Sequence, residues 1–145
     1  MFTNLLPTSE KLFNVRYLPY AEGHYLKSFI KKYPGIQWDM TNKSIIADLG
    51  RLRMPNNTTQ QSQQIDELKH KDCYWLAKYD FKIAGTKEST KSSGNRAIVF
   101  IDTDKDELDI MMIYHKSDLP KNKDETAYVM NTVKEQYGEY AERFE

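Results

Sequence analysis

The chain has 145 residues, the length of one ordinary domain, and its 39% hydrophobic residues exclude global disorder. Its one cysteine, Cys73, excludes an internal disulfide and a thiolate zinc cluster, and its longest apolar runs (97–101 and 110–114) are far shorter than the roughly 20 residues of a membrane-spanning helix. The 21 basic residues balance 21 acidic ones, which argues against nucleic-acid binding driven by overall net charge. We therefore expect a single cytoplasmic domain over residues 1–145, held together by packing and without a membrane partner.

The first half of the chain predicts a strand followed by two helices. Residues 12–18 form a short run of apolar and β-favouring residues. Apolar residues then recur at helical spacing over about 19–33, and a second apolar stripe, capped at 41 or 42, runs to 53. The short connection between these helices predicts an antiparallel helical hairpin. The polar run 56–64 then predicts a loop.

The second half predicts a sheet and a closing helix. Residues 72–81 are rich in aromatics and predict a strand, and the apolar runs 97–101 and 108–114 predict a hairpin at the centre of the sheet. An apolar stripe at helical spacing predicts a final helix over about 125–144. The expected fold is therefore α+β, with an N-terminal helical hairpin packed on an antiparallel sheet of at least three strands and a C-terminal helix.

Charge is unevenly distributed along the chain. Between Lys78 and Arg96 there are five basic residues and two acidic ones, a net charge of +3. The segments 102–109 and 124–145 each carry a net charge of −4. The neutral average therefore conceals a basic middle with acidic flanks.

Acidic residues at alternate positions 102, 104 and 106 resemble the start of a calcium-binding loop. The sixth position of that loop holds Glu107 instead of glycine, and the twelfth holds Ile113 instead of glutamate, so we reject a calcium site. The three histidines lack metal-ligand spacing, and the chain contains neither a phosphate-binding glycine motif nor a Gly-x-Ser-x-Gly elbow. We expect no metal and no cofactor.

The basic stretch ends where the predicted central hairpin begins. Arg96 opens the first strand of that hairpin, and Tyr114, His115 and Lys116 end the second. Because antiparallel pairing brings the end of the second strand beside the start of the first, Arg96 is expected near these three residues. The alternative is that the lysines are ordinary solvated surface and that Tyr114 is a strand residue facing the helices.

Arginine and lysine on one concave surface would bind a phosphodiester and stabilise the extra negative charge of a pentacoordinate transition state without a metal. A lysine or a histidine there could exchange protons with a ribose 2′-hydroxyl or with the leaving oxygen, and tyrosines could stack on bases. The candidate catalytic residues are Arg96, Lys82, Lys91 and His115, and the candidate RNA-binding residues are Lys78, Lys87, Tyr79, Tyr114 and Lys116.

Three segments carry a family resemblance. The three segments are Asp72-Cys73-Tyr74 with the lysine-bearing strand that follows, the run 92–96 (Ser-Ser-Gly-Asn-Arg) and the end of the hairpin at 113–116 (Ile-Tyr-His-Lys). They resemble the core of RelE/ParE-type bacterial toxins, in the branch of RelE and HigB, which cleaves mRNA. The resemblance covers roughly residues 68–119. It implies a helical hairpin packed on a small antiparallel sheet. It also implies a metal-independent ribonuclease that acts on mRNA, usually in the ribosomal A site, under the control of a cognate antitoxin.

The resemblance also implies roles for particular residues. Arg96 matches the family's strand-leading arginine, which contacts the scissile phosphate. One of Lys82, Lys87 and Lys91 resembles the lysine that serves in the family as a base or a phosphate clamp. His115 and Lys116 end the second strand of the hairpin, where the family often has a basic or acid-donating residue. The chain departs from the family in its neutral net charge and its long acidic closing helix.

The expected function is that of a toxin of a type II toxin-antitoxin system acting as an endoribonuclease, which inhibits translation. The substrate's 2′-hydroxyl would attack the adjacent phosphorus and leave a 2′,3′-cyclic phosphate. Two alternatives stay open at this stage. One is a ParE-like inhibitor of DNA gyrase without ribonuclease activity, and the other is a non-catalytic interaction protein on the same fold.

Overall fold

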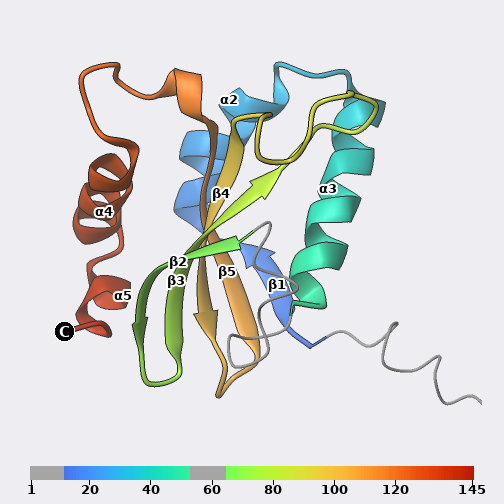
Figure 1. The fold of residues 1–145 in the computed structure, drawn as a ribbon. Helices are drawn as coiled ribbons and strands as arrows, with labels where there is room; N and C mark the ends of the chain where they lie inside the picture. Colours follow the sequence, from blue (N-terminus) through green and yellow to red (C-terminus); the bar gives the residue numbers. More distant parts are fainter. Residues whose placement is uncertain (1–11, 53–64) are drawn as a thin grey trace, which may run out of the picture.

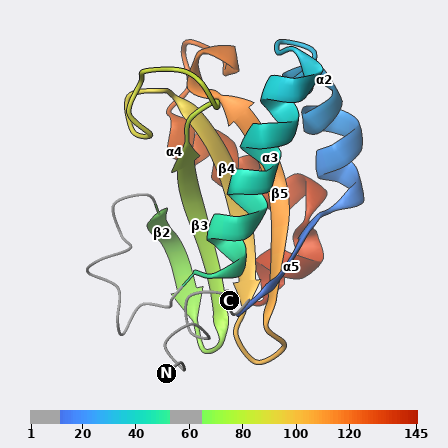
Figure 2. The ribbon, with the colours of Figure 1, turned by 90° about the vertical axis from the view of Figure 1, so that its right-hand side faces the viewer.

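The computed structural model describes residues 12–52 and 65–145 and shows one five-stranded sheet with helices on both faces (Figures 1 and 2). The strand order is β1-β5-β4-β3-β2, so β4 lies at the centre. No helix in the described ranges is long and apolar enough to cross a membrane. The strands are β1 (Asn14–Tyr17), β2 (Ile65–Lys71), β3 (Tyr74–Phe81), β4 (Asn95–Asp102) and β5 (Glu107–His115).

The predicted central hairpin is confirmed. β4 and β5 pair antiparallel, with Arg96 directly opposite Tyr114 and Asn95 opposite His115. β3 pairs antiparallel with the other side of β4, so Asp80 lies opposite Arg96. The start of β4 is therefore held between two neighbouring strands.

The α+β class is confirmed, but the expectation of a purely antiparallel sheet is wrong. β1 runs parallel to β5, with Val15 opposite Leu108, which makes the sheet mixed. β2, at the far edge, was not predicted as a strand at all. Its sequence is mostly polar. An edge strand tolerates such a sequence, since both of its faces can remain largely exposed.

Two helical segments pack on one face of the sheet, and the first of them also reaches the core of the other face through Tyr20 and Tyr25. The first continues from Pro19 through the π-helical segment η1 (Ala21–Leu26) into α2 (Lys27–Ile30), and the second is α3 (Gly35–Gly50). α3 begins directly after Pro34, several residues before the predicted cap. The reason is that Thr41 does not cap the helix but lies inside it and is buried, where its hydroxyl donates to the Gln37 carbonyl (2.9 Å) and accepts from the Ala84 N–H (2.8 Å). α3 ends at Gly50, before the predicted helix end at 53. The predicted loop at 56–64 lies outside the described residues.

The closing helix is divided into α4 (Glu125–Gln136) and α5 (Gly138–Glu142), where one helix was predicted. Tyr137 separates them with a non-helical backbone, φ −132° and ψ 48°. Its hydroxyl donates to the Met111 carbonyl on β5 (2.8 Å), which fixes the break against the sheet. Asp124 caps α4 by accepting from the Ala127 N–H (3.0 Å).

Alternation along β4 divides the core between the two faces of the sheet. Ala97, Val99 and Ile101 pack towards α2 and α3, whereas Ile98 and Phe100 pack towards α4 and α5. Because side chains two residues apart share a face, Arg96 points to the α4 side, at the end of that apolar row.

Candidate functional site

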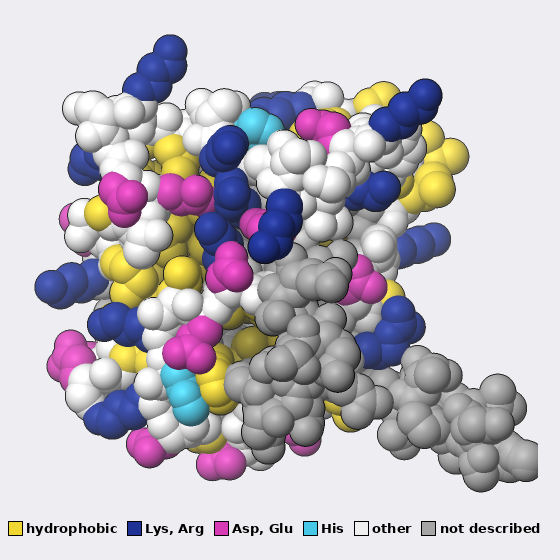
Figure 3. Space-filling view, viewed as in Figure 1, with side chains coloured by type: hydrophobic (Ala, Val, Ile, Leu, Met, Phe, Trp, Pro, Cys, Tyr) yellow, Lys and Arg dark blue, Asp and Glu magenta, His cyan; other side chains and the backbone are white. Residues whose placement is uncertain are grey.

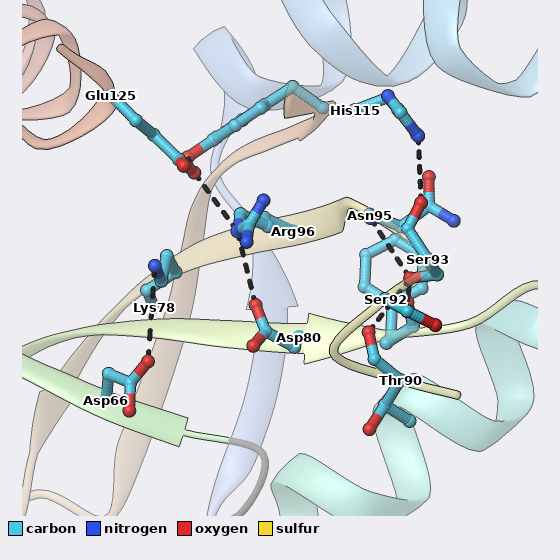
Figure 4. A network of polar contacts seen from close by, with 12 residues as sticks. Asp66, Lys78, Asp80, Thr90, Ser92, Ser93, Asn95, Arg96, His115 and Glu125 are labelled. Carbon is cyan, nitrogen blue, oxygen red and sulfur yellow. Dashed lines mark hydrogen bonds and ion pairs between the residues drawn. The ribbon is translucent and has the colours of Figure 1, made fainter. Parts of the chain in front are cut away.

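Arg96 is the centre of a charged cluster at one end of the sheet (Figure 4). Its side chain is only 11% exposed, and its Nε lies 3.3 Å from Asp80 Oδ1 and 3.1 Å from Glu125 Oε2. Asp80 comes from the neighbouring strand β3, and Glu125 comes from the first turn of α4. A guanidinium that is almost completely removed from water is thus compensated by two carboxylates.

The contacts of Arg96 leave donors unsatisfied. Its Nε and Nη1 atoms are buried without an aligned hydrogen-bond acceptor in the described part of the chain, and Asp80 Oδ1 is buried without an aligned donor. The carboxylates therefore lie close enough for ion pairing, but their geometry does not use these N–H groups. Buried polar groups in folded proteins normally have a hydrogen-bond partner, so these groups retain hydrogen-bonding capacity that the described residues do not use.

Tyr114 holds one of the two carboxylates. It is 3% exposed on β5, and its hydroxyl donates to Glu125 Oε2 (2.8 Å). Burial, followed by the hydrogen bond to Glu125, raises the pKa of Tyr114 far above its ordinary value, so the hydroxyl remains protonated and remains a donor. Tyr114 is consequently a buried positioning group rather than an open surface for stacking on a base.

Lysines extend the cluster outwards. Lys78, on the same face of β3, lies 4.0 Å from Asp66 Oδ2 on β2, and the positive charges of Arg96, Lys78 and Lys91 each act to lower the pKa of Asp80. Burial nevertheless outweighs these cations and raises the pKa of Asp80 above its usual range. Figure 3 shows Lys and Arg side chains gathered on this part of the surface with Asp and Glu side chains beside them. The expected basic surface is therefore present, but it is interleaved with acids.

Tyr79, a predicted RNA-stacking residue, lies away from this cluster. It occupies the opposite face of β3, is 4% exposed, and donates its hydroxyl to Asp48 on α3 (3.0 Å). Its place is in the core beneath α3, because odd-numbered residues of β3 face the first pair of helices.

His115 also points away from Arg96, since it lies opposite Asn95 and not opposite Arg96. Its Nε2 lies 2.8 Å from the Ser93 carbonyl, and its Nδ1 accepts from the backbone N–H (3.1 Å) and the hydroxyl (2.7 Å) of Ser117. This arrangement defines the tautomer with the proton on Nε2, which donates to Ser93. Nε2 thus joins the end of β5 to the segment before β4, and Nδ1 is occupied by the turn that follows β5.

The other predicted residues are exposed on the loops around the cluster. Lys82 follows β3, Lys87 lies in the long connection to β4, and Lys116 follows β5, where its side chain passes over Gly94. The structure therefore brings Arg96, Lys78 and Tyr114 to one face. It places Tyr79 and His115 away from that group, and Lys82, Lys87, Lys91 and Lys116 lie on the exposed segments around it.

Sequence reasoning missed the three acidic members of the cluster, Asp66, Asp80 and Glu125. The position of Asp80 follows from the register of β3 on β4, so extending the strand pairing by one strand would have placed it beside Arg96. Asp66 lies on a strand that was not predicted. Glu125 has no local signal, because its position depends on how α4 docks across the sheet.

Within the described ranges, no three His, Cys, Asp or Glu side chains form a group that could hold a metal ion. Comparisons with protein-family models, with curated proteins and with solved structures found no significant match for this chain. The functional argument therefore depends on the residues of the cluster and on their geometry.

Proposed function

We propose that the protein is a toxin of a type II toxin-antitoxin system that cleaves mRNA without a metal ion, in association with the ribosome. The observation that carries the proposal is the Arg96 guanidinium, which lies at the start of the central strand with unsatisfied N–H groups and with Lys78 on the same face. The order of helical pair, sheet and closing helix agrees with the RelE/ParE resemblance. The proposed regulatory partner is a cognate antitoxin protein.

In the proposed reaction, Arg96 binds the scissile phosphate and stabilises the charge that develops when the substrate's own 2′-hydroxyl attacks phosphorus. The new P–O2′ bond displaces the 5′-oxygen of the next nucleotide and leaves a 2′,3′-cyclic phosphate. Lys78 and Lys91 contact flanking phosphates. Of the predicted proton carriers we assign proton transfer to Lys91, in the segment that leads into β4: it accepts the proton of the 2′-hydroxyl and returns a proton to the leaving 5′-oxygen.

The proposal is tested by inducing the wild-type gene and an Arg96→Ala variant in a bacterial host while following growth and primer extension on abundant mRNAs. Arg51→Ala is the matched control, because Arg51 is an exposed arginine at the end of α3, on the other side of the sheet. We expect growth arrest with new mRNA ends for the wild type and the control, and neither for Arg96→Ala. New ends that persist in Arg96→Ala would refute the assigned site.

A second candidate is a binding protein without RNA chemistry, either a gyrase inhibitor or an interaction protein on this fold. The observation that favours it is the internal use of the candidate groups, since Arg96 faces two carboxylates and His115 has both nitrogens occupied. The same induction experiment separates the candidates. Growth arrest with intact mRNA would favour gyrase inhibition, and no arrest in any strain would favour the interaction protein.

A further inference from the structure

We propose that Glu125 is an internal substitute for the substrate phosphate, so that the first turn of α4 closes the Arg96 site in the free protein. This inference rests on the proposed function, because it assumes that Arg96 binds a phosphodiester. It adds that binding requires displacement of the Glu125 carboxylate by a phosphate oxygen.

The geometry at Glu125 Oε2 supports this assignment. That single oxygen lies 3.1 Å from Arg96 Nε and accepts the Tyr114 hydroxyl at 2.8 Å. Carboxylate and phosphate oxygens are equivalent ligands for a guanidinium, and both accept from a neutral hydroxyl. A phosphate oxygen at the position of Oε2 would therefore inherit both contacts, and Arg96 would exchange one anion for another without being left uncompensated.

Of the two carboxylates on Arg96, Glu125 is the one that can leave. Asp80 is anchored within β3 between two paired strands, and its side chain is 6% exposed. Glu125 has a side chain that is 25% exposed and lies in the first turn of a helix, at the end of an exposed connection over 120–124. Helix ends open at low free-energy cost compared with central strands. Rotation of the Glu125 side chain, or fraying of one turn, is sufficient to release it.

Glu125 therefore competes with the substrate and lowers its apparent affinity. Removing the competing charge while keeping the size of the side chain, as in Glu125→Gln, is expected to tighten phosphodiester binding by about tenfold, the range of one partly buried ion pair. Tyr114→Phe, which removes the hydroxyl that holds Glu125, also takes a donor from the incoming phosphate, so its gain should be smaller.

The test uses a fluorescently labelled single-stranded DNA oligonucleotide with the base sequence of an mRNA segment. Because 2′-deoxyribose lacks the attacking hydroxyl, this probe is not cleaved. Binding is measured by fluorescence anisotropy for the full-length wild type, Glu125→Gln, Arg96→Ala and the double variant. Glu139→Gln is the matched control, because Glu139 is an exposed acid in the first turn of α5. Thermal melts confirm that each variant is folded, and Tyr114→Phe replaces Glu125→Gln if the latter fails to fold.

We expect Glu125→Gln to bind more tightly than the wild type, Glu139→Gln to bind like the wild type, and the gain to disappear in the Arg96→Ala background. Equal binding by Glu125→Gln and wild type, with weaker binding by Arg96→Ala, would overturn the role of Glu125 and leave the phosphate site intact. A gain that persists without Arg96 would also overturn it, as an unspecific charge effect. Unchanged binding by Arg96→Ala together with no effect of Glu125→Gln would instead overturn the proposed function at this site.

Discussion

Gly94, directly before β4, is expected to be one of the most sensitive positions in the protein. Its φ is +79°, a left-handed conformation that costs a residue with a Cβ atom roughly 1–2 kcal/mol. A Cβ at this position would also lie 2.8 Å from His115 Nε2 and 3.0 Å from His115 Cε1. The ring would have to move and lose its hydrogen bond to the Ser93 carbonyl, a further loss of about 0.5–1.5 kcal/mol. Gly94→Ala should therefore destabilise the fold by about 1.5–3.5 kcal/mol.

Gly85→Ala provides the control. Gly85 has a similar φ of +86°, but an added Cβ would have no neighbour within 4 Å, so only the conformational cost applies. Urea unfolding of the two variants and the wild type isolates the contribution of the close approach to His115. The Gly94 variant should lose more stability than the Gly85 variant, and the difference should vanish when His115→Ala is added to both. Equal losses for the two glycine variants would refute the reasoning.

Three further predictions concern the core and the charged cluster. Phe100→Ala, which empties a fully buried position facing α4 and α5, should cost about 3–5 kcal/mol in urea unfolding, and a loss below about 1 kcal/mol would contradict the packing described. Tyr137→Phe should cost about 1–3 kcal/mol, because it leaves the Met111 carbonyl without its buried donor; an unchanged melting temperature would argue against this contact. Burial raises the pKa of Asp80 above its ordinary 3.8, so the native state binds the carboxyl proton of Asp80 more tightly than the unfolded chain does. The wild type therefore loses stability as the pH rises through that raised pKa and the buried carboxyl group ionises. The stability of Asp80→Asn relative to wild type should consequently increase between about pH 4 and pH 7 in paired urea titrations, and a decrease would contradict the sign of the shift.

The central hairpin could be predicted from the sequence because its signals are local. Two apolar runs flank a short acidic turn, which predicts their pairing as a hairpin. A one-residue register shift between Ile98 and Val99, which the sequence does not indicate, then places Arg96 opposite Tyr114 instead of Ile113. The same local reasoning cannot assign side chains to the two faces without the register. Asn95 and Arg96 are neighbours in sequence, but they face opposite sides of the sheet, and so do Tyr114 and His115. His115 was expected beside Arg96 because closeness along the chain was taken for closeness of side chains.

The elements that were missed depend on long-range contacts. β2 is mostly polar and becomes a strand through its pairing with β3. β1 pairs in parallel with β5, and the Arg16–Asp109 ion pair between these strands joins residues that are 93 positions apart in the sequence. Glu125 reaches Arg96 only because α4 packs on the face of the sheet to which Arg96 points. Periodicity and capping predict that a helix forms, but they do not predict the surface on which it packs.

The chemistry of the RNA ends tests the central claim most directly. Purified protein is incubated with ribosome-bound mRNA, and the newly formed 3′ ends are captured by a ligase that requires a 2′,3′-cyclic phosphate. A second mRNA carries a single 2′-deoxyribose at the mapped cleavage position. We expect cyclic-phosphate ends with the wild type, no cleavage at the 2′-deoxy position, and loss of the ends with Arg96→Ala. Intact mRNA with the folded wild-type protein, or equal cleavage by Arg96→Ala, would contradict the assignment of Arg96 as the phosphate-binding centre of a ribonuclease.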